Sequence, residues 1–174
     1  MNDKSILYII GFMGCGKSTI GKKLASLLGW SFVDLDTKIE EETGKTIPEL
    51  FNQFGEEHFR KIEAGSLQRL ITSKNTVIST GGGTPCFGDN MDLMLETGLT
   101  IYLKLTPAQL KNRLSGAHRE RPLIREIGDA DLLGYIEGKL AEREGWYNRA
   151  EIIIDGFDIN KADLLTLVRK NIVT

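Results

Sequence analysis

The residues with the clearest chemical potential form a glycine-rich segment near the N-terminus. The segment Gly11-Phe-Met-Gly-Cys-Gly-Lys-Ser18 fits the pattern G-x-x-x-x-G-K-[ST], directly after an apolar run and before residues at helical spacing. In such a loop the glycines let successive backbone N–H groups converge on phosphate oxygens, and the helix N-terminus adds positive potential. Lys17 would reach the β- and γ-phosphates, and the Ser18 hydroxyl would coordinate Mg²⁺. The segment predicts a nucleoside-triphosphate site formed by Gly14, Cys15, Gly16, Lys17, Ser18 and Thr19.

Cys15 lies inside this loop and has two interpretations. The simpler one is a small residue that the loop accommodates. The alternative is a thiol activated by the N-terminus of the following helix, because a helix N-terminus favours the thiolate. The alternative predicts that alkylation of Cys15 inactivates the protein and that ATP slows the alkylation.

Two carboxylates, Asp34 and Asp36, stand at the end of the second expected strand. Alternate residues of an extended segment point the same way, so we expect both to face the phosphate loop. One can hold the water shell of a metal ion, and the other can orient a hydroxyl and take its proton. A solvated turn or a helix cap is the alternative. Because the third expected strand ends without an aspartate, Asp34 is the favoured acid for Mg²⁺.

Two further features suit an acceptor that carries a negative charge and hydroxyl groups. Gly81-Gly82-Gly83 follows the third expected strand and could expose backbone N–H donors to a ligand, unless it is only a mobile turn. Arg60 and Glu63 lie three residues apart on an expected helix. Glu63 could therefore hold the guanidinium of Arg60 towards a carboxylate, although an ordinary surface ion pair is the alternative.

A basic segment at residues 113–125 contains Arg113, Arg119, Arg121 and Arg125. A nucleic-acid patch, a solvated loop and a closing lid are the three interpretations. We favour a lid over about residues 113–127, because phosphoryl transfer develops charge on the transferred group and an arginine brought in by closure stabilises it. Arg121 is the arginine to which we assign this role.

The expected elements would place these residues at one edge of a sheet. Strands alternate with helices, which predicts an open, mostly parallel α/β sheet, and ligands bind beyond the carboxyl ends of its strands. The strands are expected at 5–10, 31–35, 76–80, 99–105 and 152–155. Helices are expected after the phosphate loop as far as Gly29, over 37–72 with interruptions near Gly44 and Gly55, at 88–96, from Pro107, at 129–148 and at the C-terminal end.

Length and composition indicate a globular protein of one domain. The 174 residues suit one domain, 1–174, with 41% hydrophobic and 26% charged residues. The formal net charge of -2 gives no global signal for nucleic acid, and no apolar run is long enough for a membrane span. Two cysteines cannot build a disulfide framework, so we expect a cytoplasmic protein. From the charge and the lack of a long apolar run we expect neither nucleic-acid nor membrane partners.

A nucleotide-dependent switch is the alternative from another class of protein. The segment Asn160-Lys-Ala-Asp163 resembles the guanine-reading N-K-x-D element of GTPases. Only eleven residues follow it, which is too few for another strand and helix, and Asn160 is more simply a helix cap. A small-molecule kinase is favoured, because candidates for binding an acceptor are abundant.

Taken together, these segments resemble the shikimate kinase family. The resemblance spans nearly the whole chain and is carried, in order, by the phosphate loop, Asp34-x-Asp36, the segment from Phe51 to Glu63, Val77-Ile-Ser-x-Gly-Gly-Gly83 and Arg121-Pro-Leu123. It implies the nucleoside monophosphate kinase-like fold, a three-layer α/β/α arrangement with a five-stranded parallel sheet and a mobile lid. It also implies ATP-dependent phosphorylation of the 3-hydroxyl of shikimate, in chorismate and aromatic amino acid biosynthesis, by a monomer with one Mg²⁺. A kinase for a gluconate-like carboxylated polyol on the same fold is the alternative.

The resemblance also implies roles for individual residues. Asp36 would bind ring hydroxyls and act as the base, and Lys17 and Arg121 would be catalytic with it. Ser18 and Asp34 would serve Mg²⁺, and Arg113 would stack on adenine. The acceptor segment would cover about residues 34–63, and the acceptor-binding residues would be Asp36, Phe51, Phe59, Arg60, Gly81, Gly82, Gly83 and Arg143.

Overall fold

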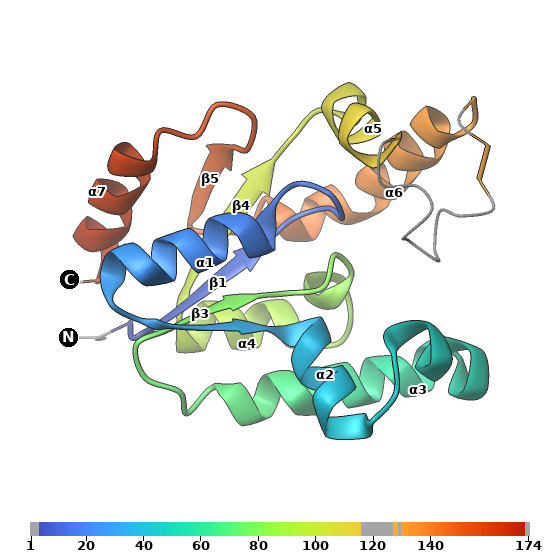
Figure 1. Cartoon of the computed structure of the whole chain (residues 1–174), viewed down its shortest axis with the longest axis horizontal. Coiled ribbons are helices and arrows are strands. Elements are labelled where there is room, and N and C mark those ends of the chain that lie inside the picture. Colours follow the sequence, from blue (N-terminus) through green and yellow to red (C-terminus); the bar gives the residue numbers. More distant parts are fainter. Residues whose placement is uncertain (1–3, 116–126, 129, 173–174) are drawn as a thin grey trace.

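The chain forms a five-stranded parallel sheet in the strand order β2-β3-β1-β4-β5, as the alternation of elements predicts (Figure 1). A computed structural model describes residues 4–115, 127–128 and 130–172. Within these residues the strands are β1 (Ile6–Ile10), β2 (Ser31–Asp34), β3 (Thr76–Ser79), β4 (Leu99–Lys104) and β5 (Ile152–Asp155). The helices are α1 (Lys17–Leu28), α2 (Leu35–Thr43), α3 (Ile47–Leu70), α4 (Asn90–Thr97), α5 (Pro107–Ser115), α6 (Leu132–Tyr147) and α7 (Lys161–Ile172), with a 3-10 turn, η1, at Thr84–Cys86.

Helices cover both faces of the sheet, and the central strand shows why. All five residues of β1 are buried, because its apolar side chains meet a helix on either side. Ile9 points towards α1, where it lies close to Gly21. Its neighbour Tyr8 points the opposite way and shares a hydrogen bond with Thr97 at the end of α4, with 2.9 Å between the two hydroxyl oxygens. The protein is therefore a three-layer α/β/α structure, as predicted.

The carboxyl ends of β1, β2 and β3 bring three of the predicted motifs together. Asp34 at the end of β2 lies in register with Ser79 at the end of β3, and Ile9 of β1 lies beside the same Ser79. The phosphate loop follows β1, and the glycine triplet follows β3. In-register parallel strands therefore place both loops at one edge of the sheet.

Local signals set the start of α3, the element that carries Arg60 and Glu63, and the kink within it. Thr46 and Glu49 form a capping box at its start, which satisfies backbone N–H groups that lack helical partners. Gly55 interrupts the helix at φ 78° and ψ 171°, a backbone conformation that glycine tolerates. The interruption that the sequence predicts near Gly55 is thus a kink within one helix.

The prediction that Asp34-Leu35-Asp36 is one extended segment is wrong. β2 ends at Asp34, and α2 begins at Leu35. Asp34 is the N-cap of α2, because its Oδ1 accepts hydrogen bonds from the backbone N–H groups of Asp36 (3.2 Å) and Thr37 (3.4 Å). Asp36 therefore lies in the first turn of a helix. Among the described helices, none is both long and apolar enough to cross a membrane.

Candidate active site

The phosphate loop wraps around the amino group of Lys17. This side chain is 9% exposed, and its Nζ donates to the carbonyl oxygens of Gly11 and Phe12, both at 2.9 Å. Gly14 adopts φ 79°, and a Cβ atom there would lie 2.8 Å from a methyl group of Leu114. The loop thus requires glycine at this position for both its backbone conformation and the space available.

Ser18, Asp34 and Ser79 form a cluster of oxygen atoms beside the loop. The Ser18 hydroxyl donates to Oδ2 of Asp34 at 2.6 Å, and the hydroxyl oxygens of Ser18 and Ser79 are 3.3 Å apart. Hard cations such as Mg²⁺ prefer oxygen ligands and keep several waters. The described residues contain no group of three or more His, Cys, Asp and Glu side chains that could hold a metal ion. The oxygen atoms of Ser18, Asp34 and Ser79 are nevertheless of the type that such a cation binds.

Two cavities meet at this edge of the sheet. The first, of about 520 Å³, follows the phosphate loop and also reaches Asp34, Ser79 and Arg113. The second, of about 360 Å³, lies between α3, the glycine triplet and α6. Met13, Asp36, Gly81 and Gly82 line both. A ligand in one cavity would therefore lie next to a ligand in the other.

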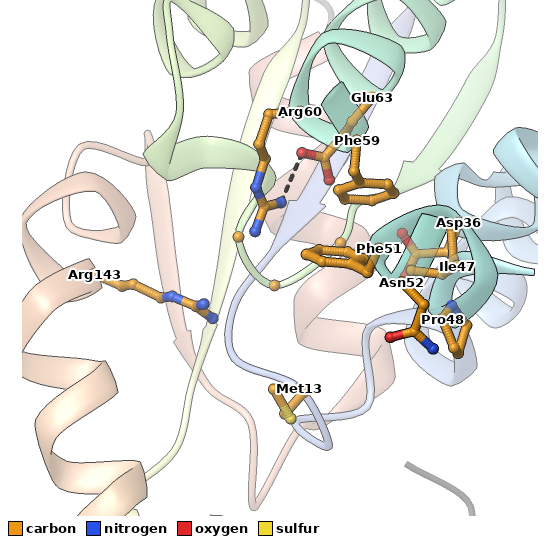
Figure 2. Close-up of a pocket in the computed structure, with 13 residues that line it drawn as sticks. Met13, Asp36, Ile47, Pro48, Phe51, Asn52, Phe59, Arg60, Glu63 and Arg143 are labelled. Atoms are coloured by element: carbon orange, nitrogen blue, oxygen red, sulfur yellow. Dashed lines mark hydrogen bonds and ion pairs between the residues drawn. The ribbon is translucent and has the colours of Figure 1, made fainter. Parts of the chain in front are cut away.

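The second cavity combines aromatic walls with two guanidinium groups (Figure 2). Arg60 reaches it from α3, and Arg143 reaches it from α6. A ring of modest size can pack on the aromatic walls while its charged group meets an arginine. The side chains labelled in Figure 2 are Met13, Asp36, Ile47, Pro48, Phe51, Asn52, Phe59, Arg60, Glu63 and Arg143.

Glu63 holds Arg60 in place from inside the protein. Its side chain is 1% exposed, its Oε2 accepts from Arg60 at 2.9 Å, and its Oε1 accepts from the Thr84 hydroxyl at 2.6 Å. The guanidinium carbon of Arg60 also lies 3.9 Å from the centre of the Phe87 ring. The interpretation of this pair as an ordinary surface ion pair is wrong, since Glu63 is buried.

Asp36 lies where the two cavities join, in a setting that favours its neutral form. Burial is the main cause that raises the pKa of Asp36 from 3.8 to about 6, and the negative charges of Asp34 and Glu63 add to it. Lys17 acts in the opposite direction. A carboxylate with a pKa near 6 is mostly ionised at pH 7 and still basic enough to accept a proton from a hydroxyl.

The glycine triplet lets the protein's own side chains approach closely. A Cβ atom at Gly83 would lie 2.6 Å from a guanidinium nitrogen of Arg60, and one at Gly81 would lie 3.0 Å from Oδ1 of Asp36. The Gly82 carbonyl accepts a hydrogen bond from the Tyr147 hydroxyl. The absence of side chains here therefore creates room for the charged residues that line the cavity.

A third, smaller cavity lies on the far side of the phosphate loop. Arg113 extends over it and donates to the carbonyl oxygens of Cys15 (2.9 Å) and Gly156 (3.3 Å). Phe157, which is 65% exposed, lines the same cavity. An exposed aromatic ring and a fixed guanidinium are the groups on which a planar base can stack. Cys15 itself is 1% exposed, which disfavours the hypothesis that it is an accessible reactive thiol.

Some of the expected site residues are not described, and some described ones were not expected. Arg121 and most of the expected lid at 113–127 lie outside the described residues. The sequence alone assigns no role to several residues that line or support the cavities: Met13, Asn52, Ser79, Thr84, Phe87, Tyr147 and Phe157. Met13, Asn52 and Ser79 lie inside the segments that carry the family resemblance, and Ser79 had a further signal in its position at the end of a strand beside Asp34.

A phosphate loop, an adjoining acceptor cavity and a carboxylate between them, on a parallel α/β sheet, define a small-molecule kinase of the P-loop class. Comparison with known proteins identifies the family. A family model for shikimate kinase matches residues 13–172 of the chain. The shikimate kinase of Parabacteroides distasonis is 40% identical over 149 residues, which cover 86% of each chain. The chain belongs to the shikimate kinase family.

Solved structures agree with this assignment. The crystal structure of shikimate kinase from Bacteroides thetaiotaomicron has a TM-score of 0.89 and 36% identity, and the match covers 97% of this chain and 98% of that one. Shikimate kinase from Acinetobacter baumannii, solved in complex with shikimate, has a TM-score of 0.86 and 31% identity, with 99% and 94% covered. The fold described here is thus the fold of that family.

Proposed function

We propose that this chain transfers the γ-phosphoryl group of ATP to the 3-hydroxyl of shikimate, giving 3-phosphoshikimate and ADP, in chorismate and aromatic amino acid biosynthesis. The observation that carries the proposal is the position of Asp36, which lines both the phosphate cavity and the acceptor cavity. Shikimate is a small ring with one carboxylate and several hydroxyls. It therefore suits a cavity with two arginines, two phenylalanines and a carboxylate at its inner end.

The acceptor would lie with its carboxylate towards the arginines and its hydroxyls towards the phosphate loop. Arg60 and Arg143 would hold the carboxylate, since guanidinium groups match its two oxygens. Phe51 and Phe59, whose ring centres are 4.4 Å apart, would wall the ring. The triplet Gly81, Gly82 and Gly83 would contact a hydroxyl. These contacts orient the hydroxyl towards the nucleotide, which lowers the entropic part of the barrier.

Asp36 would bind the reacting hydroxyl and accept its proton as the oxygen attacks the γ-phosphorus. Burial and the charges of Asp34 and Glu63 raise its pKa to about 6, which makes it a stronger base and still leaves it mostly ionised at pH 7. The phosphoryl group leaves ADP and forms a bond to the acceptor oxygen. Lys17, which holds the carbonyl oxygens of Gly11 and Phe12 in the loop, would turn to the phosphate oxygens when ATP binds.

The nucleotide would follow the phosphate loop, with phosphate contacts from Gly14, Cys15, Gly16, Ser18 and Thr19, and its base would stack between Arg113 and Phe157. Ser18 and Asp34 would hold Mg²⁺, the former directly and the latter through water, which fits their oxygen donors. When bound, the ion would offset negative charge on the β- and γ-phosphates. The proposed roles of Arg121 and of the lid concern residues outside those described.

We propose that the protein acts as a monomer, which is what the resemblance to the shikimate kinase family implies. Cytoplasmic localisation stays a prediction from the sequence. The function is tested by ADP release in the presence of ATP and Mg²⁺, with shikimate, quinate, gluconate and nucleoside monophosphates as acceptors. We expect the highest kcat/KM with shikimate. Faster turnover with any other acceptor would overturn the assignment of the substrate, and a preference for GTP would revive the switch alternative.

A further inference from the structure

Two carboxylates, not one, bind the guanidinium of Arg60. Glu63 accepts from NH1 at 2.9 Å. Glu56 accepts from NH2 at 3.0 Å and from Nε at 3.3 Å, both with its Oε1 atom. Glu56 therefore occupies the Nε–NH2 edge, one of the edges on which a guanidinium binds a carboxylate through two parallel hydrogen bonds.

The two carboxylates differ greatly in how easily they can leave. The Glu63 side chain is 1% exposed and is also bound to the Thr84 hydroxyl at 2.6 Å, so its departure would leave a buried charge without partners. The Glu56 side chain is 56% exposed, so water can solvate its carboxylate when it turns away. Glu56 is therefore the carboxylate that can be displaced.

The kink at Gly55 lowers the cost of displacement further. Glu56 is the first residue after the kink and precedes Arg60 by one helical turn, the spacing at which side chains meet. An acidic residue at the start of a helical stretch is also favourable when it points to solvent, because the N-terminal end carries positive potential. Both orientations of Glu56 are thus low in energy.

We propose that Glu56 is a built-in competitor for the carboxylate of the acceptor. Glu56 holds the Nε–NH2 edge of Arg60 in the empty enzyme and turns to solvent when the acceptor carboxylate takes its place. The cluster of Arg60, Glu56 and Glu63 carries one net negative charge and repels an anion. Glu56 therefore has to leave before Arg60 can bind the acceptor carboxylate. The device weakens the binding of an anionic acceptor, because its carboxylate has to displace Glu56, and it leaves the binding of a neutral molecule unchanged. The inference rests on the proposed function, since it requires a carboxylate at Arg60.

The test compares Glu56→Gln with Glu57→Gln. Glu57 is the matched control, because it lies on the same helix and pairs with Lys61, four residues later at 2.7 Å, where Glu56 pairs with Arg60. Both changes remove one negative charge, and thermal melting checks that both variants fold. Isothermal titration calorimetry should show a shikimate Kd about two- to fivefold lower for Glu56→Gln, the effect of losing one partly exposed ion pair, and an unchanged Kd for Glu57→Gln.

A neutral ligand separates competition from a general effect on the cavity. The methyl ester of shikimate should bind the wild type and Glu56→Gln equally, because it has no carboxylate to compete with Glu56. An unchanged or higher shikimate Kd for Glu56→Gln, an equal gain for Glu57→Gln, or an equal gain for the ester would overturn the inference. If the wild type neither binds nor phosphorylates shikimate, the proposed function itself fails. If it does both and Glu56→Gln changes nothing, only the competitor role fails.

Discussion

Asp36→Asn should make the protein more stable while it removes activity. Asp36 is held in a buried position near Asp34 and Glu63, and its pKa is raised from 3.8 to about 6. Because the unfolded chain ionises at a lower pH than the folded one, ionisation of Asp36 opposes folding. An asparagine has the same shape and no charge, so the substitution removes this opposition.

The size of the effect follows from the pKa. A rise of about two pKa units corresponds to about 3 kcal/mol, which is an upper limit because the site can relax. At pH 7.5 we expect Asp36→Asn to raise the free energy of unfolding by about 1–3 kcal/mol, or the Tm by about 2–10 °C.

The two pKa values determine how the difference in stability between the wild type and Asp36→Asn changes with pH. Below about pH 3 Asp36 is mostly protonated in both states, so the wild type and the variant should be about equally stable. Between about pH 4 and 6 only the unfolded state ionises, and the wild type loses its share of stability as the pH rises.

Urea unfolding at pH 4, 5, 6 and 7.5 measures this difference directly. Asp34→Ala is the control, because it removes a neighbouring carboxylate that caps α2 and should destabilise the protein by about 1 kcal/mol. A variant Asp36→Asn that is less stable than the wild type at pH 7.5 would refute the reasoning. A gain in stability that does not depend on pH would refute it as well.

Three further predictions concern the cavities. The value of kcat/KM should fall as the pH drops through about 6, and Glu63→Gln should move this fall to lower pH, because the charge of Glu63 raises the pKa of Asp36. Glu63→Gln should also raise the KM for shikimate about tenfold, because Arg60 loses a buried partner. Gly83→Ala should raise that KM by about tenfold or more, since the new Cβ would lie 2.6 Å from the guanidinium of Arg60. Arg113→Ala should raise the KM for ATP about five- to tenfold and leave the Kd of shikimate unchanged, as steady-state kinetics and calorimetry would show.

Each of these predictions has a control or a contrary outcome. Gly138→Ala matches Gly83→Ala, because a Cβ at Gly138 on α6 would meet nothing within 4 Å, and its kinetics should equal those of the wild type. A fall in kcat/KM that stays at the same pH in Glu63→Gln would mean that another group sets it. Equal losses of ATP and shikimate binding in Arg113→Ala would place this arginine outside a dedicated base site.

Local rules account for the parts of the fold that the sequence predicted well. Glycines determine the conformation of the phosphate loop. The apolar run of β1 predicts a strand that is buried on both faces, in a parallel sheet with helices on either side. The break at Gly55 was visible because glycine is the residue that tolerates its backbone angles. Each of these features depends on residues close together in the chain.

The sequence predicted that Asp36 lies at the site, but it predicted the wrong backbone conformation for this residue. An aspartate at the end of a strand and an aspartate that caps a helix look alike in a sequence. Here Asp34 is both, and its cap turns the chain so that Asp36 lies on the first turn of α2. The carboxylate reaches the cavity through a helical turn and not through the alternation of a strand.

The environment of Arg60 could not be predicted, because it depends on contacts between distant segments. The turn after β3 brings the Thr84 hydroxyl, from 21 residues away, to the buried carboxylate of Glu63. The same turn brings the ring of Phe87 against Arg60. No spacing in the sequence encodes either contact, so a buried ion pair and a surface pair were equally acceptable there.

The most direct test of the central claim is a crystal structure of the protein with shikimate and a non-hydrolysable ATP analogue. We expect the 3-hydroxyl to lie about 3–3.5 Å from the γ-phosphorus, within hydrogen-bond distance of Asp36, and the carboxylate to lie on Arg60. Shikimate bound in the reverse orientation, or with no hydroxyl near Asp36, would contradict the claim.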